Sequence, residues 1–254
     1  MKIASWNVNS LNVRLPHVID WVRSEQPDVL GLQETKLTDE KFPKDAIEAE
    51  GYHVVFAGQK TYNGVAILSK QAPTEVIFDV DDLDDPSRRI SSATFGDLRV
   101  LNLYVVNGKA VDDEKYHHKL HWLDRVTAHI ERELKTYPNM VVVGDFNIAP
   151  ADADIYDPEA WHEKILCSTP EREALARIMA LGFDDAFRLF EQEEGAFSWW
   201  DYRMAAFRRK MGLRIDLTLT SKALRERVVA AGIDVEPRRW ERPSDHAPVW
   251  VELA

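Results

Sequence analysis

The chain has 254 residues, 45% of them hydrophobic, and a formal net charge of -11 at pH 7. Such an acidic balance argues against a general affinity for polyanions, so any nucleic-acid function needs basic residues gathered locally. The single cysteine, Cys167, excludes an intramolecular disulfide. With no signal peptide and no apolar stretch long enough to cross a bilayer, the sequence predicts a cytoplasmic protein without a membrane segment. No linker divides the chain, and we expect residues 1–254 to form one domain.

The first part of the chain is predicted to contain several strands and one helix. Apolar patterning favours a helix over 15–22 that stops before Pro27, and strands over 2–8, 28–36, 52–57 and 64–69. Asn7 and Glu34 lie at the ends of the first two strands. The segment 79–85 holds five aspartates. We interpret it as a solvated acidic loop, because it lacks the ligand spacing of an EF-hand calcium loop.

The middle of the chain predicts one strand and the longest helix. In the strand, 98–106, period-2 alternation puts Asn102 and Tyr104 on one face and apolar residues on the other. Tyr104 is either a packed aromatic or a hydroxyl presented to a ligand. The helix, 114–137, carries three histidines, His117, His118 and His121. The outer two are one turn apart and could bind zinc, but no third ligand is supplied, so a solvated helix face is favoured.

The stretch 140–147, with sequence MVVVGDFN, predicts a fully buried strand that ends in polar residues. Gly144 is expected to let the chain turn sharply as it leaves the sheet. Asp145 and Asn147 then lie at the strand end, where a carboxylate and an amide could hold a cation, orient a water and grip a phosphate oxygen. An ordinary turn is the alternative, because Gly, Asp and Asn all favour turns.

Residues 149–169 predict an irregular loop, and residues 170–181 predict a helix closed by Gly182. The loop contains His162 and Cys167 as its reactive residues. We interpret the cysteine as inert, since nothing nearby in the sequence is placed to depress its pKa.

Aromatic and basic residues alternate over 197–214. This is the local basic patch that nucleic-acid binding requires, although the arginines could instead pair with the abundant carboxylates. Residues 213–220 alternate strictly, which places Asp216 on the polar face of a strand, where a partner must compensate its charge. The last predicted strand covers 246–253 and begins at His246, directly after Asp245.

Eight polar residues lie at or near strand ends or on a strand's polar face: Asn7, Glu34, Tyr104, Asp145, Asn147, Asp216, Asp245 and His246. In layered folds with parallel strands such ends gather at one edge and form the binding crevice. Glu34 with Asp145 or Asp245 is the hard-oxygen set that Mg²⁺ or Mn²⁺ prefers. Asp216 could orient His246, as an aspartate does in hydrolase triads. Because no Ser or Cys nucleophile is evident, the sequence indicates water attacking phosphorus at a metal site.

Five motifs also carry a family resemblance: WNVN at 6–9, LQETK at 32–36, GDFN at 144–147, LRID at 213–216 and SDHAPV at 244–249. In this order they resemble exonuclease III-type apurinic/apyrimidinic endonucleases of the endonuclease/exonuclease/phosphatase superfamily. The resemblance implies an α/β fold, a four-layered sandwich of two packed β-sheets flanked by helices. It also implies a Mg²⁺- or Mn²⁺-dependent DNA repair phosphodiesterase that cuts 5′ to abasic sites, with 3′→5′ exonuclease and 3′-end-cleaning activity on double-stranded DNA.

The resemblance further implies a role for each site residue. Glu34 would be the principal metal ligand, with four others around the same site, Asn7, Asp145, Asn147 and Asp245. Asp145 would deprotonate or orient the attacking water, and Asn147 would hold that water or the scissile phosphate. His246, oriented by Asp216, would stabilise the charge of the transition state. Tyr104 would contact the phosphate or assist the leaving group.

For DNA, the resemblance implies a backbone grip and a pocket. Lys36 and Asn107 would hold the nucleic-acid backbone, while Trp199 and Leu213 would wall an apolar pocket for the flipped, baseless sugar. The cations from Arg203 to Arg214 would lie along the DNA groove, and we expect the protein to act as a monomer.

Two departures and two competing functions stay open. Ser10 stands where many relatives have glycine, and the 149–169 loop lies where relatives vary. We hypothesise that His162 in this loop narrows access to the pocket. A phosphatase of small phosphoesters could use the same metal core, and a DNA-binding module that has lost catalysis is the alternative from a different class.

Overall fold

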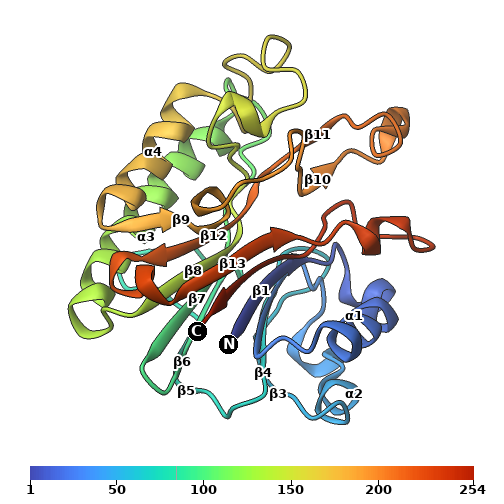
Figure 1. Cartoon of the computed structure of the whole chain (residues 1–254), viewed down its shortest axis with the longest axis vertical. Helices are drawn as coiled ribbons and strands as arrows, with labels where there is room; N and C mark the ends of the chain where they lie inside the picture. Colours follow the sequence, from blue (N-terminus) through green and yellow to red (C-terminus); the bar gives the residue numbers. More distant parts are fainter. Residues whose placement is uncertain (84) are drawn as a thin grey trace.

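A computed structural model describes residues 1–83 and 85–254 of the chain. Two six-stranded mixed β-sheets pack face to face, and helices cover their outer faces, α1 and α2 on one side and α3 and α4 on the other (Figure 1). This is the four-layered α/β sandwich that the sequence predicted. Within the described residues, no helix is long and apolar enough to cross a membrane.

The first sheet has the strand order β13-β14-β1-β2-β4-β3. Its strands are β1 (Lys2–Asn7), β2 (Val29–Gln33), β3 (His53–Ala57), β4 (Val65–Ser69), β13 (Val228–Ile233) and β14 (Val249–Leu253). Helices α1 (Leu11–Glu25) and α2 (Lys44–Glu48) cover its outer face. Strands β1 and β2 are parallel, so Asn7 and Gln33 end side by side and Glu34 follows at the same edge.

The second sheet has the order β5-β6-β7-β8-β12-β9. Its strands are β5 (Thr74–Ile77), β6 (Ile90–Phe95), β7 (Leu98–Tyr104), β8 (Met140–Asp145), β9 (Phe183–Asp185) and β12 (Asp216–Ser221). Helices α3 (Glu114–Thr136) and α4 (Thr169–Ala180) pack on it. A small hairpin, β10 (Trp199–Trp200) with β11 (Gly212–Leu213), stands apart from both sheets.

The sequence analysis missed several strands, and two of its predictions about these elements were wrong in detail. Strands β5, β6, β9 and β13 were not predicted at all. The expected strand over 213–220 is divided into β11 and β12, with Arg214 and Ile215 between them. Gly144 does not turn the chain out of the sheet, because β8 continues to Asp145. A Cβ atom at Gly144 would lie 1.9 Å from the Leu103 carbonyl oxygen, so close contact between β7 and β8 is what requires glycine here.

The structure also bears on two other expectations, the acidic loop at 79–85 and the helix that carries three histidines. Residues 79–83 and 85 form no helix or strand, as predicted, while Asp84 lies outside the described residues. Asp85 is not solvated: its side chain is buried, with one carboxylate oxygen 3.9 Å from Arg89 Nε and 3.8 Å from His118 Nε2. His117 and His121 are exposed, and neither belongs to a potential metal cluster in the described part of the chain.

The layer between the two sheets changes from apolar to polar along the strands. Inward side chains run Ile3, Ser5 and Asn7 on β1, Val141, Val143 and Asp145 on β8, and Val100, Asn102 and Tyr104 on β7. The outward residues between them pack on the helices. Strict alternation along buried strands therefore gives one apolar end, which stabilises the sandwich, and one polar end, which holds the candidate site.

Asn102 joins the two sheets where the layer becomes polar. Its amide nitrogen donates to the Leu32 carbonyl at 3.0 Å and the Ala66 carbonyl at 3.1 Å, and its oxygen accepts from Gln33 Nε2 at 2.6 Å. Gly31 provides the space, because a Cβ atom there would lie 2.8 Å from the Asn102 amide. A fully satisfied buried amide of this kind fixes how one sheet sits on the other.

The turn after β1 is joined by backbone hydrogen bonds to the turn that carries Glu34. The Ser10 amide donates to the Glu34 carbonyl at 2.8 Å, and the Leu11 amide donates to the Thr35 carbonyl at 3.0 Å. Glu34 and Ser10 both have positive φ, 54° and 88°. Ser10 thus occupies a backbone conformation that glycine adopts without strain, which explains why glycine suits this position.

We predict that Ser10→Gly stabilises the protein by about 1 kcal/mol, because relief of backbone strain exceeds the extra entropy of glycine in the unfolded chain. The Ser10 side chain makes no capping hydrogen bond that the substitution would remove. Urea denaturation monitored by circular dichroism measures the change. A lower unfolding midpoint for the variant would contradict the prediction.

Candidate active site at the polar end of the sandwich

Strand register gathers the predicted site residues from both sheets. In the second sheet, Tyr104 and Asp216 lie on either side of Asp145, paired with it from β7 and β12. In the first sheet, Asn7 and Glu34 follow from the parallel ends of β1 and β2. The sequence prediction that these strand ends meet at one edge is therefore confirmed by the geometry.

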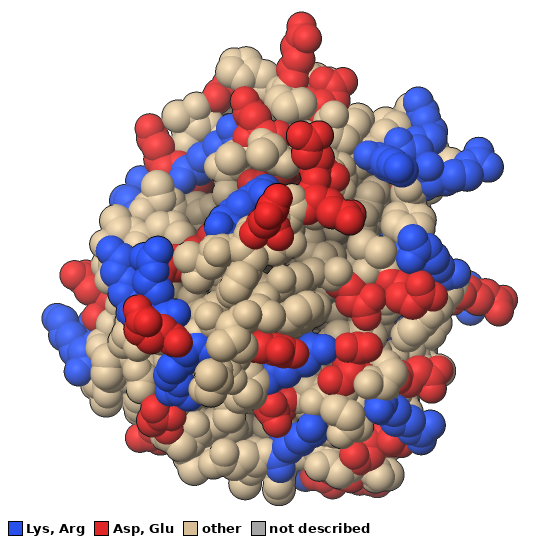
Figure 2. Space-filling model, viewed as in Figure 1, with Lys and Arg blue, Asp and Glu red and all other residues tan. Residues whose placement is uncertain are grey.

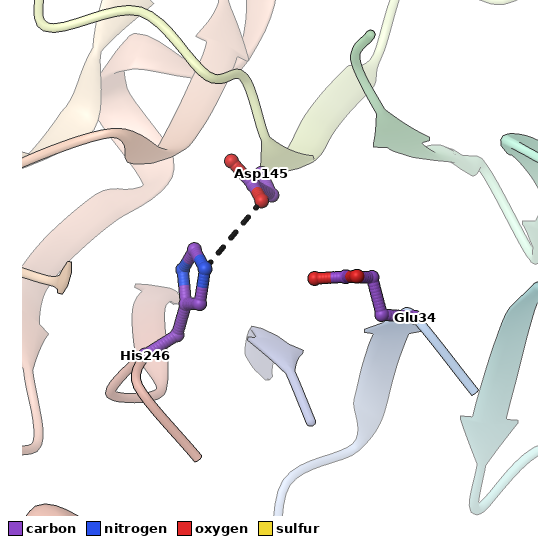
Figure 3. A group of neighbouring side chains, drawn as sticks. All are labelled: Glu34, Asp145 and His246. Atoms are coloured by element: carbon purple, nitrogen blue, oxygen red, sulfur yellow. Dashed lines mark ion pairs between the residues drawn. The ribbon is translucent and has the colours of Figure 1, made fainter. Parts of the chain in front are cut away.

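Glu34, Asp145 and His246 point toward one another across this edge (Figure 3). Each offers one potential ligand atom, and these atoms all lie within 4.8 Å of one another. The Asn7 amide bridges the two carboxylates, donating to Glu34 Oε2 at 2.7 Å and to Asp145 Oδ2 at 2.9 Å. Asn7 thus directs its nitrogen, not its oxygen, at the carboxylates, and in this arrangement it supports both of them.

Asp216 and His246 form the pair that the sequence suggested. His246 Nδ1 lies 2.8 Å from Asp216 Oδ2, and Nε2 lies 3.7 Å from Asp145 Oδ2. Burial lowers the pKa of His246, but the carboxylates of Asp216, Asp145 and Asp245 outweigh burial and raise it. Burial raises the pKa of Asp145, and the neighbouring His246 opposes that rise. The site therefore combines a cationic imidazole with a carboxylate that is poorly compensated.

Asn147 is held in a strained turn beside this group. Its φ is 49°, and its backbone N–H donates to Asp145 Oδ1 at 2.9 Å. Its side-chain nitrogen donates to the Val105 carbonyl at 2.9 Å. Asn107 donates to Asn147 Oδ1 at 3.1 Å. Asn107 and Asn147 are thus side by side. Non-glycine residues with positive φ are uncommon and often mark functional sites.

The donor set fits a hard divalent cation. Glu34 and Asp145 supply carboxylate oxygens, the ligands that Mg²⁺ and Mn²⁺ prefer, and a cation would compensate the buried charge of Asp145. Asp245 lies at the rim, where it accepts from Trp199 Nε1 at 3.0 Å and from Asn9 Nδ2 at 3.1 Å. Lys36 lies near by, with Nζ 3.6 Å from Glu34 Oε1.

A cavity of about 390 Å³ opens directly onto these groups. Its lining includes the polar site residues and a set of apolar side chains, Trp161, Ile165, Leu166, Trp199 and Ile215. A second, neighbouring cavity of about 360 Å³ shares Trp161, Trp199, Asp201 and Arg203 with the first. A chemically reactive edge thus adjoins an apolar recess, which is the composition of a ligand site.

Two residues assigned to DNA contact by the resemblance lie elsewhere. Leu213 has no exposed surface and lines neither cavity, because it pairs with Trp199 in the hairpin and packs beneath it. Arg214 is also buried, and it donates to Asp154 at 2.7 Å and to Asp185 at 2.6 Å. Arg214 is therefore a structural ion-pair residue and not part of a DNA groove.

The remaining cations gather at the tip of the segment between β10 and β11. Figure 2 shows Lys and Arg side chains protruding there, at the upper right. Arg203 is paired with Asp201 at 2.7 Å, whereas Arg208, Arg209 and Lys210 are exposed and form no ion pair with any described residue. The basic patch of the sequence analysis therefore exists in part.

Sequence reasoning missed two residues that shape the site. Ser198 is fully buried, and its hydroxyl accepts the backbone amides of Ile215 and Asp216, each at 3.0 Å. Trp161 lines both cavities. Neither stands at a predicted strand end, although Trp161 was a large apolar residue in a loop, which was a usable signal.

The comparisons with known proteins agree with this geometry. The sequence profile described as the endonuclease/exonuclease/phosphatase family matches residues 4–246. The chain belongs to the endonuclease/exonuclease/phosphatase family. It is 39% identical to exodeoxyribonuclease III of Haemophilus influenzae, over the whole of both chains.

Solved structures give the same assignment. The 3′ phosphatase NExo of Neisseria, bound to a product DNA hairpin, superimposes with a TM-score of 0.98 at 49% identity, covering 100% of this chain and 99% of its own. An AP endonuclease of Archaeoglobus fulgidus gives 0.95 at 37% identity with the same coverage. The prediction of an exodeoxyribonuclease III-type nuclease is therefore confirmed. The prediction of a metal cofactor is confirmed in part: the family is metal-dependent, and the site contains an acidic cluster that could bind a metal ion.

The hypothesis about His162 does not fit the loop of this family member. His162 is exposed and lines neither cavity next to the reactive groups. The neighbouring Trp161 lines both cavities, because the loop directs the Trp161 indole inward and the His162 imidazole outward. A residue of this loop does limit the cavity, but it is the tryptophan.

We predict that Asp216→Asn lowers the pKa of His246 in the metal-free protein, because one of the carboxylates that outweigh burial is lost. Histidine NMR signals followed across a pH titration measure the change. The exposed His53 serves as an internal reference. An unchanged His246 titration in the variant would contradict this account of the charge balance.

Proposed function

We propose that the protein is a divalent-metal-dependent DNA repair phosphodiesterase that cuts 5′ to abasic sites to leave a 3′-hydroxyl. On duplex DNA it also acts as a 3′→5′ exonuclease and cleans blocked 3′ ends. One observation carries the proposal: the half-buried Glu34, the buried Asp145 and a cationic histidine open onto a cavity that apolar and aromatic side chains also line. Such a cavity offers phosphate chemistry next to space for a baseless sugar.

Each reactive group has a role that its surroundings support. Glu34 and Asp145 would hold the metal, and Asp245 and Asn147 are further candidates close by. Asn7, which was expected to be a ligand, supports both carboxylates through its amide nitrogen. When bound, the ion neutralises phosphate charge and acidifies water. Asp145 takes the proton of the attacking water, a role that its burial-raised pKa favours, since a better base results.

His246 and its neighbours handle the phosphate. Asp216 keeps the His246 imidazole charged and oriented, so that Nε2 can donate to a phosphate oxygen as negative charge builds there. Asn147 lines the cavity, and its backbone amide is bonded to Asp145, so that its side chain can hold the water or the phosphate. Tyr104, whose hydroxyl lies near Glu34, contacts the phosphate or assists the leaving oxygen.

DNA binding relies on local positive charge, because the whole chain is acidic. Lys36 and Asn107 hold the backbone close to the reacting phosphate, while Arg203 and the exposed tip cations at 208–210 reach the flanking phosphates. Trp199 walls the recess for the baseless sugar. This local patch favours a nucleic-acid substrate over a small soluble phosphoester.

The remaining assignments belong to the same proposal. Mg²⁺ is the expected ion, and Mn²⁺, with the same preference for oxygen ligands, can replace it. Residues 1–254 act as one catalytic domain, in a cytoplasmic monomer whose partner is double-stranded DNA with abasic sites or blocked 3′ ends.

We predict that Asp145→Ala lowers kcat on an abasic duplex by at least about 10³-fold, because both a metal ligand and the proton acceptor are lost. DNA affinity should stay near that of the wild type, since the change removes negative charge. Gel-based cleavage in Mg²⁺ and in Mn²⁺, with fluorescence anisotropy for binding, tests both statements. The exposed Asp20→Ala is the control, and wild-type cleavage by Asp145→Ala would refute the assignment.

We predict that Trp161→Ala changes the ratio of internal abasic cleavage to 3′-end trimming in favour of the abasic site, because the indole lines both cavities and its removal enlarges the space for the baseless sugar. His162→Gly should leave that ratio unchanged, since its side chain is exposed. Matched duplexes carrying one abasic site or one 3′-phosphate measure the ratio. The reverse pattern, with only the histidine variant altered, would contradict the cavity geometry.

A further inference from the structure

A buried lysine and glutamate lie directly behind the reactive groups. Lys119 on α3 and Glu171 on α4 have no exposed surface, and Lys119 Nζ lies 2.5 Å from Glu171 Oε1. Neither residue lines the cavity or belongs to the metal-binding group. Ion pairs buried this completely are uncommon, and their Coulomb attraction scarcely exceeds the cost of removing both charges from water.

The lysine end of the pair holds two residues of the proposed machinery. Lys119 Nζ donates to the Asn147 carbonyl at 2.6 Å and to the Asn107 carbonyl at 3.1 Å. With Glu171, these acceptors use all three of its protons. The Asn147 backbone, strained at a φ of 49°, is therefore anchored through its carbonyl as well as through its amide.

The glutamate end holds the far side of the loop that walls the cavity. Glu171 Oε1 accepts the Leu166 amide at 3.0 Å, and Oε2 accepts the Ser168 amide at 3.1 Å and its hydroxyl at 2.6 Å. Leu166 lines the cavity and has a φ of 73°, a conformation that a leucine rarely adopts. The Tyr116 hydroxyl, 2.8 Å from Ser168 Oγ, closes the same network.

One ion pair thus fixes two strained residues, one at each end of the 148–165 segment. Asn147 precedes this segment and faces the reacting groups, while Leu166 follows it and faces the substrate recess. An apolar pair of similar volume would pack as well, so stability alone gives little reason for the two charges. Holding backbone groups in unfavourable conformations does require strong, directed hydrogen bonds.

We propose that Lys119 and Glu171 are positioning residues that fix Asn147 relative to the cavity wall, and so set both turnover and the choice among DNA substrates. This inference rests on the proposed function. Lys119 and Glu171 touch no reacting atom, and they act through the backbone of Asn147 and of Leu166.

The opposite end of helix α3 offers a matched control. Arg99 at the start of β7 is fully buried and pairs with Glu133 near the end of α3, at 2.8 Å. This pair also joins α3 to the rest of the fold, but it contacts no site residue. Glu133→Gln therefore reports what the loss of the carboxylate partner of a buried cation does when only stability is at stake.

The experiment compares Glu171→Gln, the double variant Lys119→Met with Glu171→Leu, and Glu133→Gln. For each, kcat and KM are measured on an internal abasic duplex and on a duplex ending in a 3′-phosphate. Amide hydrogen exchange of Asn147 and Leu166 is measured in the same proteins without substrate. The double variant removes both charges together, so that it folds without a lone buried ion.

We expect the double variant to fold and to lose kcat by about 10²-fold, because a small displacement of a positioned group costs that much. The ratio of activities on the two substrates should shift, and both amides should exchange faster. Glu171→Gln should show the same pattern, and Glu133→Gln should change neither the ratio nor those two amides.

Several results would overturn the inference. Wild-type kcat and substrate ratio in the double variant would do so, as would equal losses on both substrates that match those of Glu133→Gln. Failure of both site variants to fold, beside a folded Glu133→Gln, would make the pair a stability element only. If the wild-type protein cut neither substrate, the proposed function would fail by itself, and hydrogen exchange would still decide whether the pair holds the two residues.

Discussion

Burial of the Asp145 carboxylate between two sheets is the constraint on which the rest of the site depends. A lone charge there is strongly disfavoured, and its pKa is accordingly raised. Three groups stabilise the carboxylate: the Asn7 side-chain amide and the Asn147 backbone N–H donate hydrogen bonds to it, and the cationic His246 lies close by. What remains uncompensated is the charge that a divalent cation would balance.

The sandwich creates this constraint by a simple device. At one end of the sandwich the strands are apolar on both faces. At the opposite end the same strands carry polar residues on their inner face. The apolar end provides the hydrophobic stabilisation, and the inter-sheet amide of Asn102 sets the relative position of the two sheets. The reactive groups therefore lie at the ends of strands, while the loop and the hairpin provide the apolar lining of the cavity.

The two kinds of element meet through buried polar contacts. Ser198 ties the hairpin to the backbone of Asp216, and the Lys119–Glu171 pair ties the loop to Asn147. Membership of the endonuclease/exonuclease/phosphatase family accounts for the sandwich and its reactive edge. The chemistry of the recess depends on how these ties place Trp161, Leu166 and Trp199.

The sequence by itself determined the strand ends and the side chains on them. Period-2 alternation can be recognised without the partner strand, so it placed Tyr104 and Asp216 on polar strand faces. The ends of apolar runs located Glu34, Asp145 and His246. Only the tertiary structure decided which residues of the irregular segments face the cavity. Arg214 is buried because carboxylates 60 and 29 residues away pair with it, and Leu213 is covered by its hairpin partner. Such contacts join segments with no shared periodicity, which is why local patterning could not reveal them.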